Sequence, residues 1–156
     1  MTGRLQSEIR QTRPFKCVEE EAFLNLVRTV EVLGRGIAEV LKDAGLSPTQ
    51  YNVLRILRGA GSAGHACCEI GERLLTHDPD ITRLLDRLEE RGLVSRTRDE
   101  RDRRVVTTRI TDEGLRLLSE LDAPMTQTHV GQLGHLGPER LQSLIELLEQ
   151  ARGSAP

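Results

Sequence analysis

The stretch DITRLLDRLEERGLV, residues 80–94, carries the pattern on which the expected fold depends. Its apolar residues recur at i, i+3, i+4 and i+7, so they form one face of a helix. They are Ile81, Leu84, Leu85 and Leu88. The opposite face is polar and carries Asp80, Thr82, Arg83, Asp86, Arg87 and Glu90. Asp78 is predicted to be the N-cap and Pro79 the first helical residue, and Gly92 ends the helix.

A charged hairpin follows this helix. Residues 93–97 and 105–110 have the composition and the period of two that predict strands, and the run RDERDRR, residues 98–104, forms the tip between them. Before the helix, residues 66–75 predict a shorter helix with Ile70, Leu74 and Leu75 facing inward, preceded by a linker rich in Gly and Ala. A short helix, a tight connection, a second amphipathic helix and a charged hairpin form the layout of a winged helix-turn-helix.

Longer helices flank this unit. Residues 19–44 carry apolar residues at helical spacing, and the helix after them begins at Ser47, where Gln50 completes a capping box. Thr111 to Glu113 caps a helix with a kink expected at Pro124, and a last helix occupies residues 138–152. The apolar stripes of the flanking helices are more than a small winged domain can cover, which predicts a dimerisation layer.

Composition limits the classes of function that the protein can have. Of the 156 residues, only Phe15, Phe23 and Tyr51 are aromatic, too few for a base-stacking platform. The net charge is −2, but residues 82–104 hold eight Arg against six acidic residues, and the chain has 20 Arg and two Lys. Arg suits forked contacts to phosphate and guanine better than Lys does. There is no apolar run of about 18 residues and no secretory signal, and three cysteines without a disulfide framework fit a cytoplasmic protein.

The arrangement predicts binding of double-stranded DNA. A helix fits the major groove, where the first turn presents side chains to base edges, and an Arg-bearing hairpin can reach the minor groove. Arg104 is expected to enter that groove, braced by Asp102. The candidate DNA contacts are Asp80, Thr82, Arg83, Asp86, Arg87, Arg101, Asp102, Arg103 and Arg104. Asp86 could orient Arg83 or Arg87, or pair with an Arg on the helix surface.

Four segments together resemble the MarR family of transcriptional regulators. They are LSPTQYNVL at 46–54, EIGERL at 69–74, DITRLLDRLEERGLV at 80–94, and Asp102-Arg103-Arg104 five residues before Ile110-Thr111. The resemblance covers about residues 19–152. It implies a DNA-binding homodimer, usually a repressor, often released by a small phenolic or lipophilic ligand or by cysteine oxidation.

The fold class is accordingly mostly α (α+β), a winged helix-turn-helix with long N- and C-terminal dimerisation helices. The expected organisation is an N-terminal arm at 1–18, dimerisation helices at 19–45 and 112–152, and a DNA-binding lobe at 46–111. The protein is predicted to bind a pseudo-palindromic duplex site and to repress transcription, with no cofactor and no membrane partner.

An effector, if there is one, is expected between Phe23 and Val27 on the first long helix and Tyr51 on the next, although few aromatic residues are available to line such a crevice. A thiol-responsive regulator is an alternative, with Cys17 as the candidate. The family's peroxide-sensing branch carries its cysteine at a position that falls near Arg28 here, so Cys17 lies well before it.

Three other interpretations of the sequence have less support: a metal site, an enzyme and a protein-binding module. The group His65, Cys67, Cys68, His77 and Asp78 has ligating side chains but no spacing typical of a zinc site, so no metal is expected. No nucleophile-base set, phosphate loop or carboxylate pair indicates an enzyme. A winged-helix module that binds a partner protein instead of DNA is the alternative from another functional class.

Overall fold

The computed structural model describes residues 4–98 and 105–153. The chain divides into two compact units, Met1–Ile37 and Ala38–Pro156. The first holds α1 (Arg4–Glu8) and most of α2 (Val18–Lys42). Three glutamates in the first turn of α2 favour its dipole. Leu5 of α1 is buried, whereas Phe23, Val27 and Val30 of α2 are exposed.

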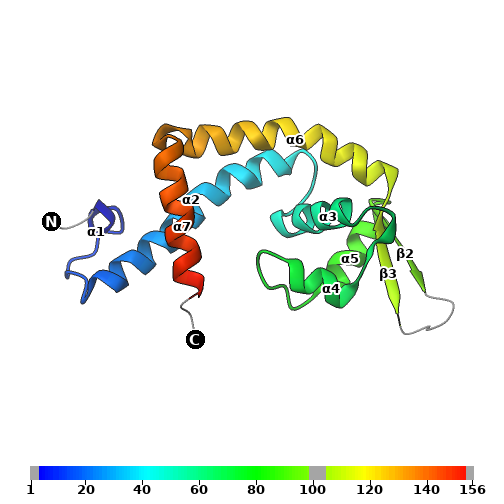
Figure 1. Ribbon diagram of the computed structural model, residues 1–156, viewed down its shortest axis with the longest axis horizontal. Helices are drawn as coiled ribbons and strands as arrows, with labels where there is room; N and C mark the ends of the chain where they lie inside the picture. The colour runs from blue at the N-terminus through cyan, green and yellow to red at the C-terminus, as the bar shows by residue number, and fades with distance from the viewer. Residues whose placement is uncertain (1–3, 99–104, 154–156) are drawn as a thin grey trace. The chain divides into compact units, whose positions relative to one another are not determined.

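The second unit contains the winged helix-turn-helix (Figure 1). Its helices and strands, in chain order, are α3 (Pro48–Ala60), η1 (Gly61–Ala63), β1 (His65–Ala66), α4 (Cys67–Arg73), α5 (Ile81–Glu90), β2 (Val94–Arg98), β3 (Val106–Ile110), α6 (Asp112–Leu133), η2 (Gly134–Leu136) and α7 (Pro138–Gly153). The mostly helical fold, the winged helix-turn-helix and the long terminal helices are all confirmed. No helix in the described part of the chain is long and apolar enough to cross a membrane.

The three strands form an antiparallel sheet in the order β1-β3-β2. Val94 pairs with Ile110 and Arg98 with Val106, which fixes the register of the wing. Strand β1 was not expected, because two residues next to glycines carry no strand pattern of their own. Gly64 permits it: its φ is +67°, and a Cβ there would lie 2.4 Å from the carbonyl oxygen of Thr108.

The core lies among α3, α4, α5, α6 and the inner face of the sheet. The side chains most completely removed from solvent include Leu54, Leu57, Ile70, Leu85, Leu88, Val94 and Leu118. Leu84, Leu85 and Leu88 of the predicted α5 stripe are therefore buried, and Ile81 is half-buried. The prediction that Leu75 faces inward was wrong, because α4 ends at Arg73 and Leu75 is 84% exposed, with its N–H bonded to the side chain of Asn52.

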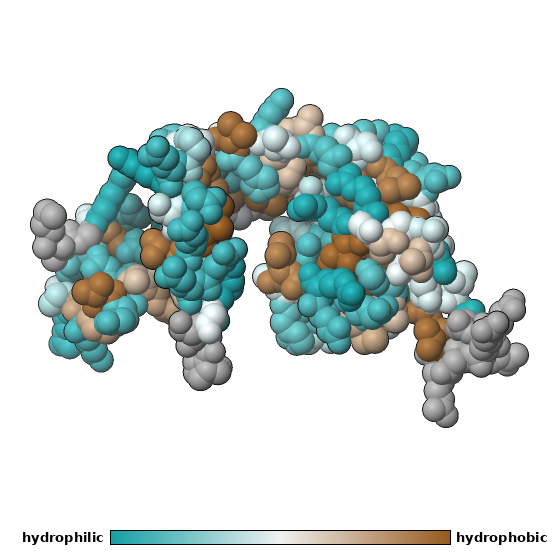
Figure 2. Space-filling view, in the orientation of Figure 1, coloured by the Kyte–Doolittle hydropathy of each residue, from teal (hydrophilic) through white to brown (hydrophobic). Residues whose placement is uncertain are grey.

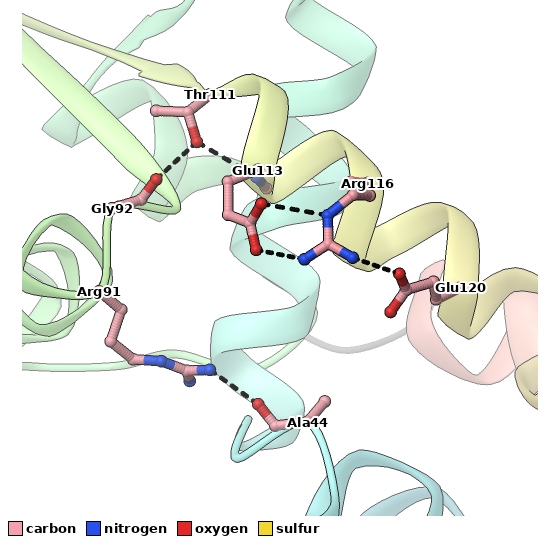
Figure 3. Close-up of polar contacts among 8 residues, drawn as sticks. Ala44, Arg91, Gly92, Thr111, Glu113, Arg116 and Glu120 are labelled. Carbon is pink, nitrogen blue, oxygen red and sulfur yellow. Dashed lines mark hydrogen bonds and ion pairs between the residues drawn. The ribbon is translucent and has the colours of Figure 1, made fainter.

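Side-chain hydrogen bonds tie the ends of the elements together (Figure 3). Arg91 donates to the carbonyls of Ala44 and Gly45 at 2.8 and 2.7 Å. The hydroxyl of Thr111 donates to the carbonyl of Gly92 at 2.6 Å and accepts from the N–H of Gly114 at 3.1 Å, so Thr111 caps α6 as predicted. These bonds fix the segments just before α3 and just after α5.

Two helix boundaries differ from the sequence expectation. Helix α5 begins at Ile81 with Asp80 as its N-cap, two residues later than predicted. Asp78 instead accepts a hydrogen bond from the N–H of Asp80 at 2.9 Å, so its carboxylate is used in the turn that precedes the helix. Helix α6 runs on through Pro124 to Leu133. The capping box of Ser47 and Gln50 at the start of α3 is confirmed.

Candidate nucleic-acid interface

Helix α5 presents one polar face to solvent. Leu84, Leu85 and Leu88 turn into the core, which leaves Thr82, Arg83 and Arg87 exposed on the other side. Asp80 accepts a hydrogen bond from the N–H of Arg83 at 3.4 Å, and its second oxygen lies 3.9 Å from the Arg83 guanidinium. The cap and the apolar stripe together set which side chains of the first turn point outward.

A polar hollow of about 250 Å³ lies between the start of α3 and α5. It is lined by Ser47, Thr49, Gln50, Asp78, Asp80, Arg83, Leu84 and Arg87. The hollow holds the carboxylates of Asp78 and Asp80 as well as two guanidinium groups, and it is the guanidinium groups that suit an anion such as a backbone phosphate. In the space-filling view, hydrophilic residues cover much of the visible face of the α3–α5 region, with some hydrophobic residues among them (Figure 2).

Asp86 has a different partner from the one expected. Its carboxylate lies 2.6 Å from Arg96 of β2, not against Arg83 or Arg87. Arg96 also donates to Glu89 through Nε at 2.8 Å and Nη2 at 2.6 Å, and the Arg96 backbone N–H donates to Glu89 at 3.1 Å. The wing strand is thereby attached to the outer side of α5 by one guanidinium between two carboxylates.

This ion-pair cluster of Asp86, Glu89 and Arg96 shifts the titration of its members. Hydrogen bonds from the Arg96 side chain lower the pKa of Glu89, and the two carboxylates raise the pKa of Arg96. The carboxylates of Asp86 and Glu89 are therefore held beside a compensating positive charge. Sequence reasoning missed Arg96, since nothing in the local pattern of a strand indicates which helix residue it will meet.

The base of the wing is held by a second arginine. Arg109 on β3 donates to the carbonyl of Ser62 and to the hydroxyl of Thr97, both at 2.8 Å. Arg98, the last residue of β2, is exposed. The predicted tip contacts Arg101, Asp102, Arg103 and Arg104 lie outside the described residues, so the brace between Asp102 and Arg104 stays a prediction.

The predicted effector and redox residues stay predictions too. Phe23 and Val27 belong to the first unit and are exposed, whereas Tyr51 is buried in the second, with the Arg55 guanidinium 5.9 Å from the centre of its ring. Cys17 is exposed. Hydrogen bonds from its own backbone N–H and from the Cys17 side chain lower the pKa of the neighbouring Glu19.

The group considered for zinc is not assembled as a metal site. Within the described ranges, no three His, Cys, Asp or Glu side chains are arranged to hold a metal ion. His65 lies 3.6 Å from Glu69, whose pKa is lowered chiefly by a hydrogen bond from the backbone N–H of Ala66.

Comparison with known proteins decides the family. A model of the MarR family matches residues 46–106, which run from just before α3 to the first residue of β3. The chain is also 30% identical over 138 residues to the uncharacterized HTH-type transcriptional regulator YkoM of Bacillus subtilis, covering 85% of this chain and 88% of YkoM. The chain belongs to the MarR family. It is therefore a DNA-binding transcriptional regulator, and the family is one of regulators rather than enzymes.

Two further proteins extend the comparison. The crystal structure of a MarR transcription factor from Planctomyces limnophilus is 45% identical to this chain, with a TM-score of 0.68, and the match covers 87% of this chain and 98% of that one. The HTH-type transcriptional repressor MdtR of Bacillus subtilis is 38% identical over 76 residues, which are 49% of this chain and 48% of MdtR.

Proposed function

We propose that this MarR-family protein is a homodimeric repressor that reads a pseudo-palindromic duplex site by placing α5 in the major groove. The observation that carries the proposal is the division of α5 into a buried leucine face and an exposed face with Thr82, Arg83 and Arg87. A helix seated on the core in this way leaves its polar side free to meet base edges and phosphates.

The exposed residues have distinct expected roles. Arg83 stands in the first turn with its side chain 70% exposed, so it can extend to a base edge, and a guanidinium forks onto the O6 and N7 of guanine. Arg87 lies one turn further along and shares the polar hollow with Arg83 and Ser47, which suits a backbone phosphate. Asp86 contributes by holding Arg96, not by contacting DNA directly.

Dimerisation is supported by apolar surface that each unit leaves exposed. Helix α7 has no buried residue over its 16 positions, although Leu144, Ile145 and Leu147 lie along it. In the first unit, Phe23 and Val30 of α2 are 64% and 71% exposed. Apolar surface of this extent on helices is typical of a subunit interface. A two-fold dimer would present two α5 helices to two half-sites.

We propose repression because MdtR, which is similar to this chain over 76 residues, is named as a transcriptional repressor. A small lipophilic or phenolic effector would release the DNA, and Tyr51, which is buried in the second unit, is the candidate residue for its site. To test the effector site, Tyr51→Phe and Tyr51→Ala would be titrated with candidate ligands in a DNA-release assay. We expect Tyr51→Ala to lose most of the ligand-induced release of DNA. If both variants release DNA as the wild type does, the effector binds elsewhere.

The test of DNA reading starts from a selection. Full-length protein would be used to recover its preferred duplex from a random pool, and dissociation constants would then be measured at fixed salt for Arg83→Gln. We expect a loss of about 1–3 kcal/mol on the selected site and relaxed choice at one base pair per half-site.

The matched control is Arg140→Gln, which removes the same charge from exposed α7. It should leave both affinity and preference near those of the wild type. If Arg83→Gln instead weakens binding equally on every sequence, Arg83 contacts phosphate and its assignment to a base is wrong.

A further inference from the structure

Helix α6 changes its surroundings along its length. Up to Met125 it contributes buried residues to the core of the winged helix-turn-helix, namely Gly114, Leu118, Leu121 and Met125. Residues 126–133 of α6 include no buried residue, and α7 after them has none either. In Figure 1, α6 runs from the wing strands to the turn that precedes α7. The first part of α6 therefore belongs to the DNA-binding core, and the second part leads to α7, through which dimerisation is proposed.

The backbone of α6 is weakened where these two parts meet. Pro124 has no N–H, so the carbonyl of Glu120 receives no helical hydrogen bond from that position. Thr126 and Thr128 donate their hydroxyls to the carbonyls of Asp122 and Pro124 at 2.8 and 2.9 Å. Such side-chain bonds to the preceding turn often bend helices. Resistance to bending is therefore reduced around Pro124.

Packing also leaves room for α6 to change direction at this level. A hollow of about 430 Å³ lies between α6 and the end of α2. Leu117, Leu121 and Pro124 line it from α6, and Val40 and Ala44 line it from the other side. A helix that borders an unfilled hollow can bend toward it without a steric clash, which close packing would prevent.

An ion pair joins α6 to α3 beside this weakened turn. Arg58, in the last turn of α3, donates through both Nη atoms to the two carboxylate oxygens of Asp122, at 2.9 and 3.0 Å. These two residues lie 64 positions apart in the chain. Asp122 and Pro124 are separated by about 200° around the helix axis, so the ion pair and the hollow lie on different sides of α6. The hydrogen bonds lower the pKa of Asp122 and raise the pKa of Arg58, so both are charged at neutral pH.

This pair restricts direction more than it adds stability. The Arg58 and Asp122 side chains are 34% and 50% exposed, and an ion pair so open to water contributes little to the free energy of unfolding. Two parallel hydrogen bonds form together only in one relative orientation of guanidinium and carboxylate. Apolar contacts between α3 and α6 have no such directional requirement. The pair therefore selects one orientation of α6 on the core.

We propose that the Arg58–Asp122 ion pair sets the half-site spacing that the dimer accepts, by fixing the angle of α6 at Pro124. The inference rests on the proposed function, in which two α5 helices of a two-fold dimer read two half-sites. Each α5 is carried by the core at one end of α6, while the other end leads to α7. A change in the angle at Pro124 moves both α5 helices, because symmetry repeats it in the partner.

The size of this movement matches the step of the DNA. The part of α6 from Asp112 to Pro124 is roughly 18 Å long at 1.5 Å per residue. A bend of about 10° at Pro124 therefore displaces its far end by roughly 3 Å. One base pair added between the half-sites shifts them by about 3.4 Å along the DNA axis and rotates them by about 35°. A small change in angle is thus enough to alter which spacing is preferred.

The first experiment measures the preference for spacing. Dissociation constants of the full-length protein would be measured on the selected duplex and on duplexes with one base pair added or removed between the half-sites. We expect the preference for the selected spacing to fall at least about threefold in Arg58→Met and in Asp122→Asn. Arg116→Met is the matched control, because its guanidinium pairs with Glu113 and Glu120 within α6. It should keep the preference within about 1.5-fold of wild type.

An equal loss of affinity on all of these duplexes would indicate only a structural role for the pair. That result, or an unchanged preference in either Arg58→Met or Asp122→Asn, would overturn the proposal. A wild-type protein that selects no paired half-sites would instead count against the proposed function, on which the inference depends.

The second experiment tests whether the bend occurs at Pro124. Pro124→Ala supplies the N–H that the carbonyl of Glu120 lacks, and so stiffens the helix at this position. In the Arg58→Met background, Pro124→Ala should restore the preference for the selected spacing to within about twofold of wild type. A double variant that is as tolerant of altered spacing as Arg58→Met alone would overturn the role of Pro124.

Discussion

Replacing Arg96 with Met tests whether the ion pairs between Arg96 of β2 and the carboxylates of α5 stabilise the packing of these two elements. The substitution keeps a side chain of similar length and removes all of its donors. It leaves the carboxylates of Asp86 and Glu89 without the guanidinium that lies 2.6 Å from each. The Arg96 side chain is 24% exposed, whereas those of Asp86 and Glu89 are 46% and 38% exposed, so water replaces part of the lost interaction.

The expected loss is about 1–2 kcal/mol of unfolding free energy. A hydrogen bond to a charged group contributes about 1.5–3 kcal/mol when well shielded, and an exposed ion pair contributes about 0.2–1 kcal/mol, so this half-exposed cluster falls between them. Urea unfolding would be followed at fixed protomer concentration, because dimerisation makes stability depend on concentration. Arg87→Met, on the same helix but outside the cluster, should change stability by less than about 0.5 kcal/mol.

DNA affinity gives a second measurement on the Arg96→Met variant. Arg96→Met should weaken binding to all sequences, because it leaves uncompensated negative charge on α5 near the phosphates. Asp86→Asn in the Arg96→Met background should recover part of both losses, and the double-mutant cycle should give a coupling of at least about 0.5 kcal/mol. A stability for Arg96→Met within about 0.3 kcal/mol of wild type, or a coupling near zero, would refute this reasoning.

The cluster also has a defined pH dependence. Since Arg96 lowers the pKa of Glu89 in the folded protein, this stabilisation is complete above the unfolded pKa of a glutamate, about 4.3, and is lost as pH falls through the lowered folded value. The stability difference between wild type and Arg96→Met should therefore narrow on acidification below about pH 4.3. A difference that grows in this range would show that Glu89 is not the titrating partner.

Three further changes test other parts of the molecule. Gly114→Ala would place a Cβ 2.4 Å from the carbonyl oxygen of Leu93, so it should lower stability by about 1–3 kcal/mol in urea unfolding; an unchanged midpoint would contradict the close approach. Ile145→Asp on exposed α7 should convert dimer to monomer in analytical ultracentrifugation, and a persistent dimer would place the interface elsewhere. Arg104→Ala should weaken binding most at A·T-rich flanks and make its salt dependence shallower, and Asp102→Ala should reproduce part of the loss; tighter binding by Asp102→Ala would disprove the brace.

Features that depend on residues within a few positions of one another could be predicted from the sequence. The capping box of Ser47 and Gln50 and the Thr111 cap each need only a side chain and a backbone N–H three residues away. The buried stripe of α5 repeats every three or four residues, so hydrophobic spacing alone predicts it. Together these local signals predict the order of elements, and with it the winged helix-turn-helix and its polar recognition face.

Tertiary structure decided which groups meet when they are far apart in the chain. Arg96 is seven residues from Glu89 and ten from Asp86, on a different element, and only the packing of β2 against α5 selects it over Arg83 or Arg87 as the partner of Asp86. Strand β1 exists because β3 supplies its hydrogen bonds. The hollow of about 440 Å³ lined by Cys67, Thr82 and Thr108 likewise forms where separate elements pack, because side-chain volume and burial are properties of the assembled core and not of any one segment.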